Sequence, residues 1–180
     1  MTSTSPTLQG QEGYLSLILP LPAALSRRIR AWRQAQGAEG QLAQASHITL
    51  LILEEQAAPA DPLALLADRL AVRGPLKISL GAPLSFEPTT PVTYLPVEEG
   101  RAELEALHGV CQELLGPSAS PFPYVPHVTL AHDLGREALD ESLTFFADLP
   151  ADEVSFSVSD LLVYRLRAGT WQPLGRVGLA

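Results

Sequence analysis

Short apolar runs alternate with amphipathic stretches along the chain, and glycine, proline and polar residues separate them. Runs rich in leucine and β-branched residues predict strands, whereas apolar residues at a spacing of three and four predict helices. In the first half we expect strands at 14–19, 46–53 and 76–80, and helices at 22–36 and 61–72. In the second half we expect strands at 92–97 and 127–131, helices at 99–115 and 136–146, and a hairpin of 154–166 and 171–179.

The order strand, helix, strand, helix, strand therefore occurs twice. The first strand of each half precedes a histidine by a similar distance, with Tyr14 33 residues before His47 and Val92 35 residues before His127. This internal repeat predicts an α+β fold of two duplicated β-α-β-α-β lobes at 13–90 and 91–180. Because no linker separates them, we expect one bilobal domain over 13–180. The polar segment 1–12 is expected to be a disordered lead.

Composition narrows the choice of partners. A hydrophobic content of 46% supports a real core, and the net charge of −8 argues against broad binding to a polyanion. A local site for one phosphate at a nucleic-acid end remains compatible with that charge. The most apolar stretch is short and broken by Pro20 and Pro22, so no membrane span is expected.

The only cysteine, Cys111, falls at helical spacing and is predicted to be a buried apolar residue. A single cysteine suits a reducing compartment, and we expect a cytoplasmic monomer.

Two copies of one tetrapeptide carry the candidate chemistry: HITL begins at His47 and HVTL begins at His127. Since side chains alternate along a strand, each histidine shares a face with the threonine two positions later, Thr49 or Thr129. If the lobes face each other, two imidazoles and two hydroxyls meet in one cleft. A single motif of this kind is usually structural, but its repetition in matching places favours a catalytic role.

Such a set of side chains suits a phosphodiester. One imidazole can take a proton from an attacking water while the other gives a proton to the leaving oxygen, because imidazole titrates near neutrality. The threonine hydroxyls can donate hydrogen bonds to the phosphate oxygens. No metal and no cofactor is required.

With these two motifs, 80 residues apart, the chain resembles the 2H phosphoesterase superfamily, and within it the LigT-like 2′-5′ RNA ligase and RNA 2′,3′-cyclic phosphodiesterase family. The resemblance implies a pseudo-twofold bilobal fold with a central groove. It implies metal-independent opening of 2′,3′-cyclic phosphate ends of RNA or nucleotides to 2′-phosphates, and reversible 2′-5′ ligation. Carried onto this chain, His47 protonates the ribose 3′-oxygen, His127 activates water, and Thr49 and Thr129 hold the phosphate.

The chain departs from many relatives at one place. Where they carry an arginine three residues after the second motif's threonine, this chain has His132, which binds phosphate less securely than a guanidinium does. Its odd offset from His127 predicts that a straight strand sends its side chain to the opposite face. His132 is thus a weaker candidate for substrate contact. The remaining histidine, His108, is expected to face solvent.

Aromatic and basic residues supply further candidates. Tyr124 and Phe122 precede the second motif in a proline-rich loop, where they could stack on a base or simply pack in the loop. A basic cluster on the first helix is either a solvated face or a guide for an RNA end; it consists of Arg27, Arg28, Arg30 and Arg33.

Two rival hypotheses remain. A metal hydrolase using His127, His132 and Asp133 is disfavoured, because strand alternation separates the two histidines. A non-catalytic RNA- or nucleotide-binding module on the same fold would keep the groove without turnover. The natural substrate and the physiological direction stay open.

Overall fold

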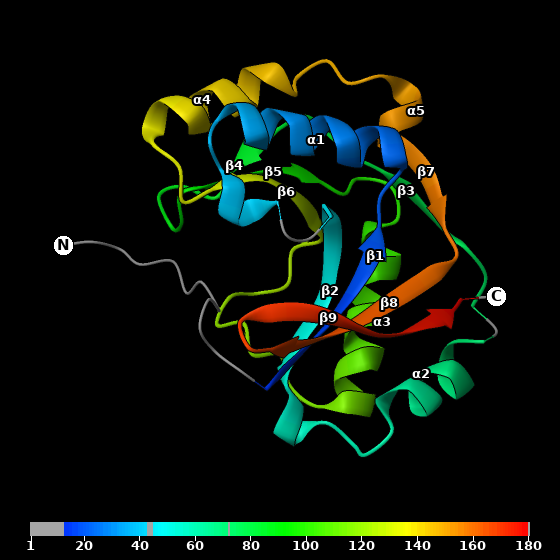
Figure 1. Cartoon of the computed structure of the whole chain (residues 1–180). Helices are drawn as coiled ribbons and strands as arrows, with labels where there is room; N and C mark the ends of the chain where they lie inside the picture. Colours follow the sequence, from blue (N-terminus) through cyan, green and yellow to red (C-terminus); the bar gives the residue numbers. More distant parts are fainter. Residues whose placement is uncertain (1–12, 43–44, 72, 180) are drawn as a thin grey trace.

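Two antiparallel sheets and the helices that cover them make up the fold in the computed structural model, which describes residues 13–42, 45–71 and 73–179 (Figure 1). The larger sheet has seven strands in the order β4-β5-β6-β2-β1-β8-β9, and the smaller one pairs β3 with β7. The α+β class predicted from the sequence is confirmed. The expected segment 1–12 lies outside the described residues, so its predicted disorder is untested.

The strands and helices fall close to the predicted positions. The strands are β1 (Tyr14–Pro20), β2 (His47–Glu54), β3 (Leu76–Ser79), β4 (Leu84–Ser85), β5 (Val92–Pro96), β6 (His127–His132), β7 (Ser155–Val158), β8 (Asp160–Arg167) and β9 (Thr170–Gly178). The helices are α1 (Ala23–Ala35), α2 (Pro62–Leu70), α3 (Arg101–Leu115), α4 (Arg136–Phe145) and α5 (Ala151–Val154), with short 3-10 turns at Glu39–Gln41 and Glu55–Ala57. Asp61 caps α2 by accepting a hydrogen bond from the Ala64 amide, as the Asp-Pro pair predicts.

The expected strand at 154–166 is wrong as one element. A break at Ser159 separates β7, which pairs with β3, from β8, which pairs with β1. The stretch has no glycine or proline to mark the break, so apolar alternation alone runs through it. The hairpin of β8 and β9 turns at Ala168 and Gly169, both with positive φ, as predicted.

The internal repeat of the sequence corresponds to two units with the same element order in the structure, β1-α1-β2 and β5-α3-β6. Pro20 of β1 lies opposite His47, and Pro96 of β5 lies opposite His127. The register of each pair shifts at the corresponding place, between Leu17 and Ile18 and between Thr93 and Tyr94. The two units therefore share their backbone irregularities as well as their element order.

The two halves of the sequence interleave in the sheet. β8 and β9 lie next to β1, and β4 lies next to β5, so strands from both halves of the sequence contribute to each side of the larger sheet. α1 and α4 lie over the β4-β5-β6 side, while α3 runs behind β1 and β2 (Figure 1). The lobe limits 13–90 and 91–180 stay a prediction.

One apolar core fills the space between the sheet and the helices. Its buried residues come from both units, including Ile48 and Val128 from the sheet, Leu25 and Ile29 from α1, and Leu107 from α3. Cys111 is a free, buried thiol in this core, as predicted, and burial raises its pKa to about 12. Because burying each large aliphatic side chain contributes about 1.5–3 kcal/mol, this core fixes the orientation of the two motif strands.

Candidate active site

The two motif strands lie side by side at the centre of the seven-stranded sheet. Ile48 of β2 is paired with Val128 of β6 in antiparallel register. One step along that register places His47 opposite Thr129, and one step the other way places Thr49 opposite His127. Residues directly opposite share a face, so all four motif side chains project from one face of the sheet. Ile48 and Val128 point to the other face and are fully buried.

Both imidazoles are anchored in the same way. Nδ1 of His47 lies 2.8 Å from the carbonyl oxygen of Ala45, and Nδ1 of His127 lies 2.6 Å from that of Val125. A carbonyl only accepts, so each Nδ1 carries a hydrogen and donates it. Nε2 of each ring therefore remains to exchange a proton with a bound substrate.

The surroundings favour the neutral form of both rings. Burial lowers the pKa of His47 and of His127 below the ordinary histidine value, although the carbonyl partners oppose the shift. The charges of Arg33 and of His127 lower the pKa of His47 further.

Each motif strand bulges directly after its threonine. Between Thr49 and Leu51 one extra residue, Leu50, faces β1, and Leu130 is the extra residue of β6 facing β5. A bulge leaves carbonyl groups outside the ladder, where they need other donors. On β2, Nδ1 of His108 donates to the Leu50 carbonyl at 2.7 Å.

The phenol of Tyr124 binds the carbonyl group next to that of Leu50 on β2, which belongs to Thr49. Its hydroxyl donates to the Thr49 carbonyl at 3.3 Å, and its ring stacks on His108 with centroids 4.1 Å apart. The expectation that His108 faces solvent is wrong, because α3 crosses β2 and its imidazole closes the bulge. Tyr124, predicted as a possible substrate contact, is half-buried behind the motif.

On β6, Arg33 of α1 donates the corresponding hydrogen bonds to the carbonyl groups at the bulge. Its Nε donates to the Leu130 carbonyl at 2.9 Å and its Nη2 to the Thr129 carbonyl at 2.6 Å. Arg33 is therefore not part of a solvated basic face, which was one reading of the cluster. Sequence reasoning missed this role because bulge positions do not show in a single sequence.

The bulge also changes the position of His132. Ala131 lies opposite Thr93 and His132 lies opposite Val92. Because Leu130 has no partner on β5, this pairing is shifted by one residue relative to the pairing of Thr129 with Tyr94. Val92 shares a face with Tyr94, which is opposite Thr129, so His132 projects from the same face as the motif side chains. The prediction that it points to the opposite face is wrong. Its Nδ1 lies 2.9 Å from the Asp133 carboxylate.

An aromatic pair borders the second motif. The rings of Phe86 and Tyr94 stack with centroids 3.8 Å apart, and each meets the His127 ring edge-on at 5.1 and 5.4 Å. Neither ring was predicted as a site residue from the sequence, although Tyr94 lies on the same face as Thr129. Phe122, which the sequence pattern suggested as a substrate contact, has 45% of its surface exposed in the loop before β6.

Two other arginines of α1, Arg28 and Arg30, have separate partners. Arg28 makes two hydrogen bonds to the Glu153 carboxylate, at 2.6 and 2.7 Å, which join α1 to α5. Arg30 donates to the Leu42 carbonyl at 2.7 Å. A hollow of about 70 Å³ lies beside the motif, lined by Arg27, Arg30, Arg33, Ala45, Ser46 and three neighbours.

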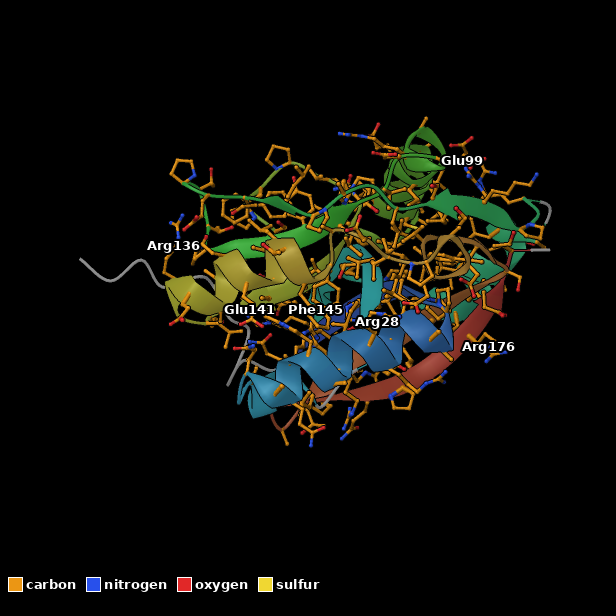
Figure 2. All side chains as sticks on the ribbon, turned by 90° about the horizontal axis from the view of Figure 1, so that it is seen from above. Arg28, Glu99, Arg136, Glu141, Phe145 and Arg176 are labelled. Atoms are coloured by element: carbon orange, nitrogen blue, oxygen red, sulfur yellow. The ribbon has the colours of Figure 1, made fainter. Side chains whose placement is uncertain are left out.

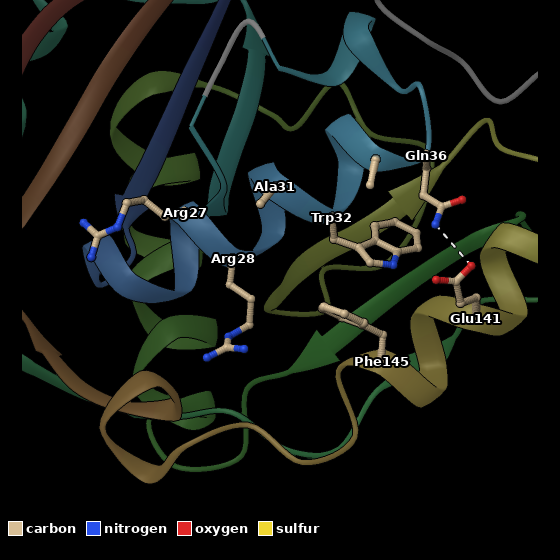
Figure 3. A pocket seen from close by; sticks show the side chains of 8 residues that line it. Arg27, Arg28, Ala31, Trp32, Gln36, Glu141 and Phe145 are labelled. Carbon is tan, nitrogen blue, oxygen red and sulfur yellow. Dashed lines mark hydrogen bonds between the residues drawn. The ribbon is translucent and has the colours of Figure 1, made fainter.

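A larger hollow of about 550 Å³ lies on the outer surface between α1 and α4, away from the histidines. Seen from above, Arg28 of α1 and Glu141 and Phe145 of α4 flank this junction (Figure 2). Trp32 and Phe145 form its apolar wall, and Gln36 bonds Glu141 across one end (Figure 3). None of the motif residues lines this hollow, so its size does not identify it as the active site.

Within residues 13–42, 45–71 and 73–179, no three His, Cys, Asp or Glu side chains gather in an arrangement that could hold a metal ion. In the same residues, no helix is both long and apolar enough to cross a membrane.

A family model described as the 2′-5′ RNA ligase superfamily matches residues 21–170. The match covers most of the chain, so the chain belongs to the 2′-5′ RNA ligase superfamily, whose members carry out phosphoesterase or RNA-ligase chemistry.

Individual relatives agree with this assignment. A protein of Geobacillus kaustophilus that bears the provisional name phosphoesterase is 33% identical over 101 residues, which are 54% of this chain and 56% of that relative's length. Escherichia coli LigT, in a crystal with 3′-AMP, superposes with a TM-score of 0.62 at 21% identity over 94% of this chain and 99% of its own. A protein of Thermus thermophilus gives a TM-score of 0.59 at 22% identity, over 92% of this chain and 97% of its own. These structures support the LigT-like fold.

Proposed function

We propose that the protein opens 2′,3′-cyclic phosphate ends of RNA or nucleotides to 2′-phosphates, with His47 and His127 as the acid–base pair. The observation that carries this proposal is the antiparallel register of β2 and β6. It sets two imidazoles and two threonine hydroxyls on one face around the Ile48–Val128 pair.

The reaction needs one neutral and one protonated imidazole. The neutral ring takes a proton from water as the water oxygen attacks phosphorus, and the bond between phosphorus and the ribose 3′-oxygen breaks. The protonated ring gives its proton to that oxygen. Atoms and charge balance, since the pair ends with its protons exchanged and returns to its starting state through solvent. Each ring can serve, because both present Nε2 to the same face.

The threonines suit the phosphate. The hydroxyls of Thr49 and Thr129 are half-buried on the face that carries the imidazoles, where each can donate one hydrogen bond to a non-bridging oxygen. Donors fixed by the strand need no reorganisation as negative charge grows on the phosphate, which is the condition for stabilising a transition state. With the 5′-hydroxyl of another RNA in place of water, the same groups would open the cyclic phosphate into a 2′-5′ phosphodiester as the ribose 3′-oxygen leaves, which is 2′-5′ ligation.

The comparisons support nucleotides as the substrate class. Crystals of Escherichia coli LigT hold 3′-AMP, ATP and NADP⁺. The stacked pair of Phe86 and Tyr94 beside His127 offers a base a flat apolar surface. We propose that a base next to the cyclic phosphate rests there, that no metal takes part, and that the protein acts as a cytoplasmic monomer.

The test is turnover in the presence of a chelator. The protein is incubated with the four 2′,3′-cyclic mononucleotides and with a short RNA that ends in a 2′,3′-cyclic phosphate, and the product is identified as a 2′- or 3′-phosphate. We expect 2′-phosphate without added metal. Tight binding of these compounds without any product would favour the binding module instead, and activity that disappears with the chelator would favour a metal hydrolase.

A further inference from the structure

Two stacked side chains of the second unit bind the backbone of the first motif strand. His108 of α3 donates from Nδ1 to the Leu50 carbonyl at 2.7 Å. The Tyr124 hydroxyl, from the loop before β6, donates to the Thr49 carbonyl at 3.3 Å. The two rings lie 4.1 Å apart and within 4° of parallel. The pair therefore binds two consecutive carbonyl groups, beginning with that of the motif threonine.

The surroundings keep this pair in place. Tyr124 packs against the apolar core, and α3 packs across β2, so both donors come from elements with fixed positions. Burial raises the pKa of Tyr124, so its hydroxyl keeps the hydrogen that it donates. A buried carbonyl without a donor is costly, and Leu50 is fully buried. The bulge of β2 is thus held by side chains where the strand ladder does not hold it.

The second motif strand is held from the opposite direction. Arg33 of α1 donates to the carbonyls of Thr129 and Leu130, the same two positions of the motif. Since α1 belongs to β1-α1-β2 and α3 to β5-α3-β6, each unit supplies donors to the motif strand of the other (Figure 1). A guanidinium on one side and an imidazole with a phenol on the other bind equivalent carbonyls. Different residues at equivalent positions indicate that holding these carbonyls is the shared task.

The motif strands need this support because they pair over a short length. In the part of the chain that the structure describes, the register of β2 with β6 consists of Ile48 opposite Val128. Thr49 comes directly after that pair, and its own carbonyl is the one that Tyr124 binds. A turn of that carbonyl turns the backbone that carries the Thr49 side chain. The direction of the hydroxyl therefore depends on the donors behind it.

We propose that His108 and Tyr124 are positioning residues that hold the β2 bulge and so direct the Thr49 hydroxyl toward the bound phosphate. The inference rests on the proposed function, in which Thr49 donates to a phosphate oxygen. A donor of this kind must lie within about 0.5 Å of its productive position to act fully. Tyr124 then acts from behind the motif and not as the substrate contact that the sequence suggested.

The test is a double-mutant cycle with a 2′,3′-cyclic nucleotide as substrate. Tyr124→Phe removes the hydroxyl and keeps the stacked ring, so it should lower kcat about fivefold and leave KM nearly unchanged. In a Thr49→Val background there is no hydroxyl to direct, and Tyr124→Phe should have no further effect. In a Thr129→Val background it should keep its full effect, because the two threonines are held separately.

His108 is tested by a pair of variants. His108→Leu removes the donor and should lower kcat roughly tenfold. His108→Asn keeps a nitrogen donor two bonds from Cβ, as Nδ1 is, and should retain most of kcat. Thr93→Val is the matched control, since it removes a buried hydroxyl that lies 2.6 Å from that of Ser142, away from the motif, and it should leave kcat unchanged.

Three kinetic results would overturn the proposal: an equal effect of Tyr124→Phe in both threonine backgrounds, a loss confined to KM, or an equal fall of kcat in Thr93→Val. The ¹³C signal of the Thr49 carbonyl reports the same bond without substrate. It should shift in Tyr124→Phe, while the Thr129 carbonyl signal stays in place. If the unaltered protein opens no cyclic phosphate, the proposed function fails and this shift alone decides whether Tyr124 holds the bulge. An unmoved Thr49 signal overturns the positioning role.

Discussion

Ile48 lies directly opposite Val128, and this single cross-strand pair relates the two motifs to each other. Both side chains are completely buried on the helix-covered face, so the polar residues on either side of them are held toward the open face. Each histidine therefore has the threonine of the other strand as its cross-strand neighbour. Neither motif alone supplies both imidazoles, so the catalysis proposed here requires both strands.

The threonine hydroxyls give the first prediction. Thr49→Val and Thr129→Val keep shape and β-branching but remove the donor, and each should lower kcat/KM for a 2′,3′-cyclic nucleotide by about 100-fold. Steady-state kinetics measure this loss. The loss should fall mainly on kcat, since the donor acts most strongly as charge builds on the phosphate.

Thr93→Val is the matched control on the neighbouring strand. Thr93 is buried on the opposite face, where its hydroxyl lies 2.6 Å from that of Ser142 on α4. Its loss should cost about 1 kcal/mol in the free energy of unfolding and leave kcat/KM unchanged. Equal losses of activity in all three variants would show that the motif threonines act only through stability.

Phe86 gives a second prediction. If a base rests on the Phe86–Tyr94 pair, Phe86→Leu should raise KM for cyclic nucleotides by roughly 10-fold, because stacking on an aromatic ring contributes about 1–3 kcal/mol per base. For a cyclic phosphate substrate that carries no base, Phe86→Leu should leave KM unchanged. Phe122→Leu, in the exposed loop, is the control variant. If KM rises in Phe122→Leu and not in Phe86→Leu, the base binds at the loop and not on the Phe86–Tyr94 pair.

The strands and most helices could be predicted from the sequence because their signals are local. Apolar runs mark β1, β2 and β6, and the Asp61-Pro62 pair marks the start of α2. The pairing of β8 with β1, by contrast, depends on contacts between residues about 150 positions apart, which no local pattern encodes. The short strand β4 is defined only by its pairing with β5.

The pH dependence of stability gives a third prediction. The pKa values of His47 and His127 are lowered in the folded protein, so below the unfolded-state value of 6.5 the unfolded chain binds more protons. The free energy of unfolding should therefore fall as the pH drops from 7.5 toward 5, by up to about 1.4 kcal/mol per pH unit for each histidine. Urea unfolding at four pH values measures the slope.

The double variant His47→Gln, His127→Gln should flatten this slope. Glu153 does not interfere, because its hydrogen bonds to Arg28 lower its pKa from 4.5, and the stability it contributes is lost only as the pH falls further. A stability that stays constant from pH 7.5 to 5 in the unaltered protein would contradict the burial of the two rings.

His132 gives a fourth prediction. The bulge at Leu130 turns position 132 to the face of the motif, so an arginine there would present a guanidinium fork to the phosphate. His132→Arg should lower KM for a 2′,3′-cyclic nucleotide several-fold, with the effect weakening at high salt. An unchanged or higher KM would show that position 132 does not reach the substrate.

The motif residues could be predicted as candidates because their pattern repeats. The side chains that bind the backbone of the motif strands could not be predicted. One extra residue after each threonine reverses the alternation that assigned His132 to the wrong face. The same bulges create the free carbonyls that Arg33, His108 and Tyr124 bind, so the roles of these three residues follow from the paired backbone. From sequence spacing alone, His108 was expected to face solvent. The arginine cluster of the first helix was expected to be either a solvated face or a guide for an RNA end.

The most direct measurement is ³¹P NMR of a 2′,3′-cyclic nucleotide incubated, with chelator, with the unaltered protein, His47→Ala and His127→Ala. The account predicts conversion to the 2′-phosphate by the unaltered protein and a loss of at least about 100-fold in both folded variants. Full turnover by either variant would contradict a mechanism in which His47 and His127 share the proton transfers, and a 3′-phosphate product would contradict proton donation to the ribose 3′-oxygen.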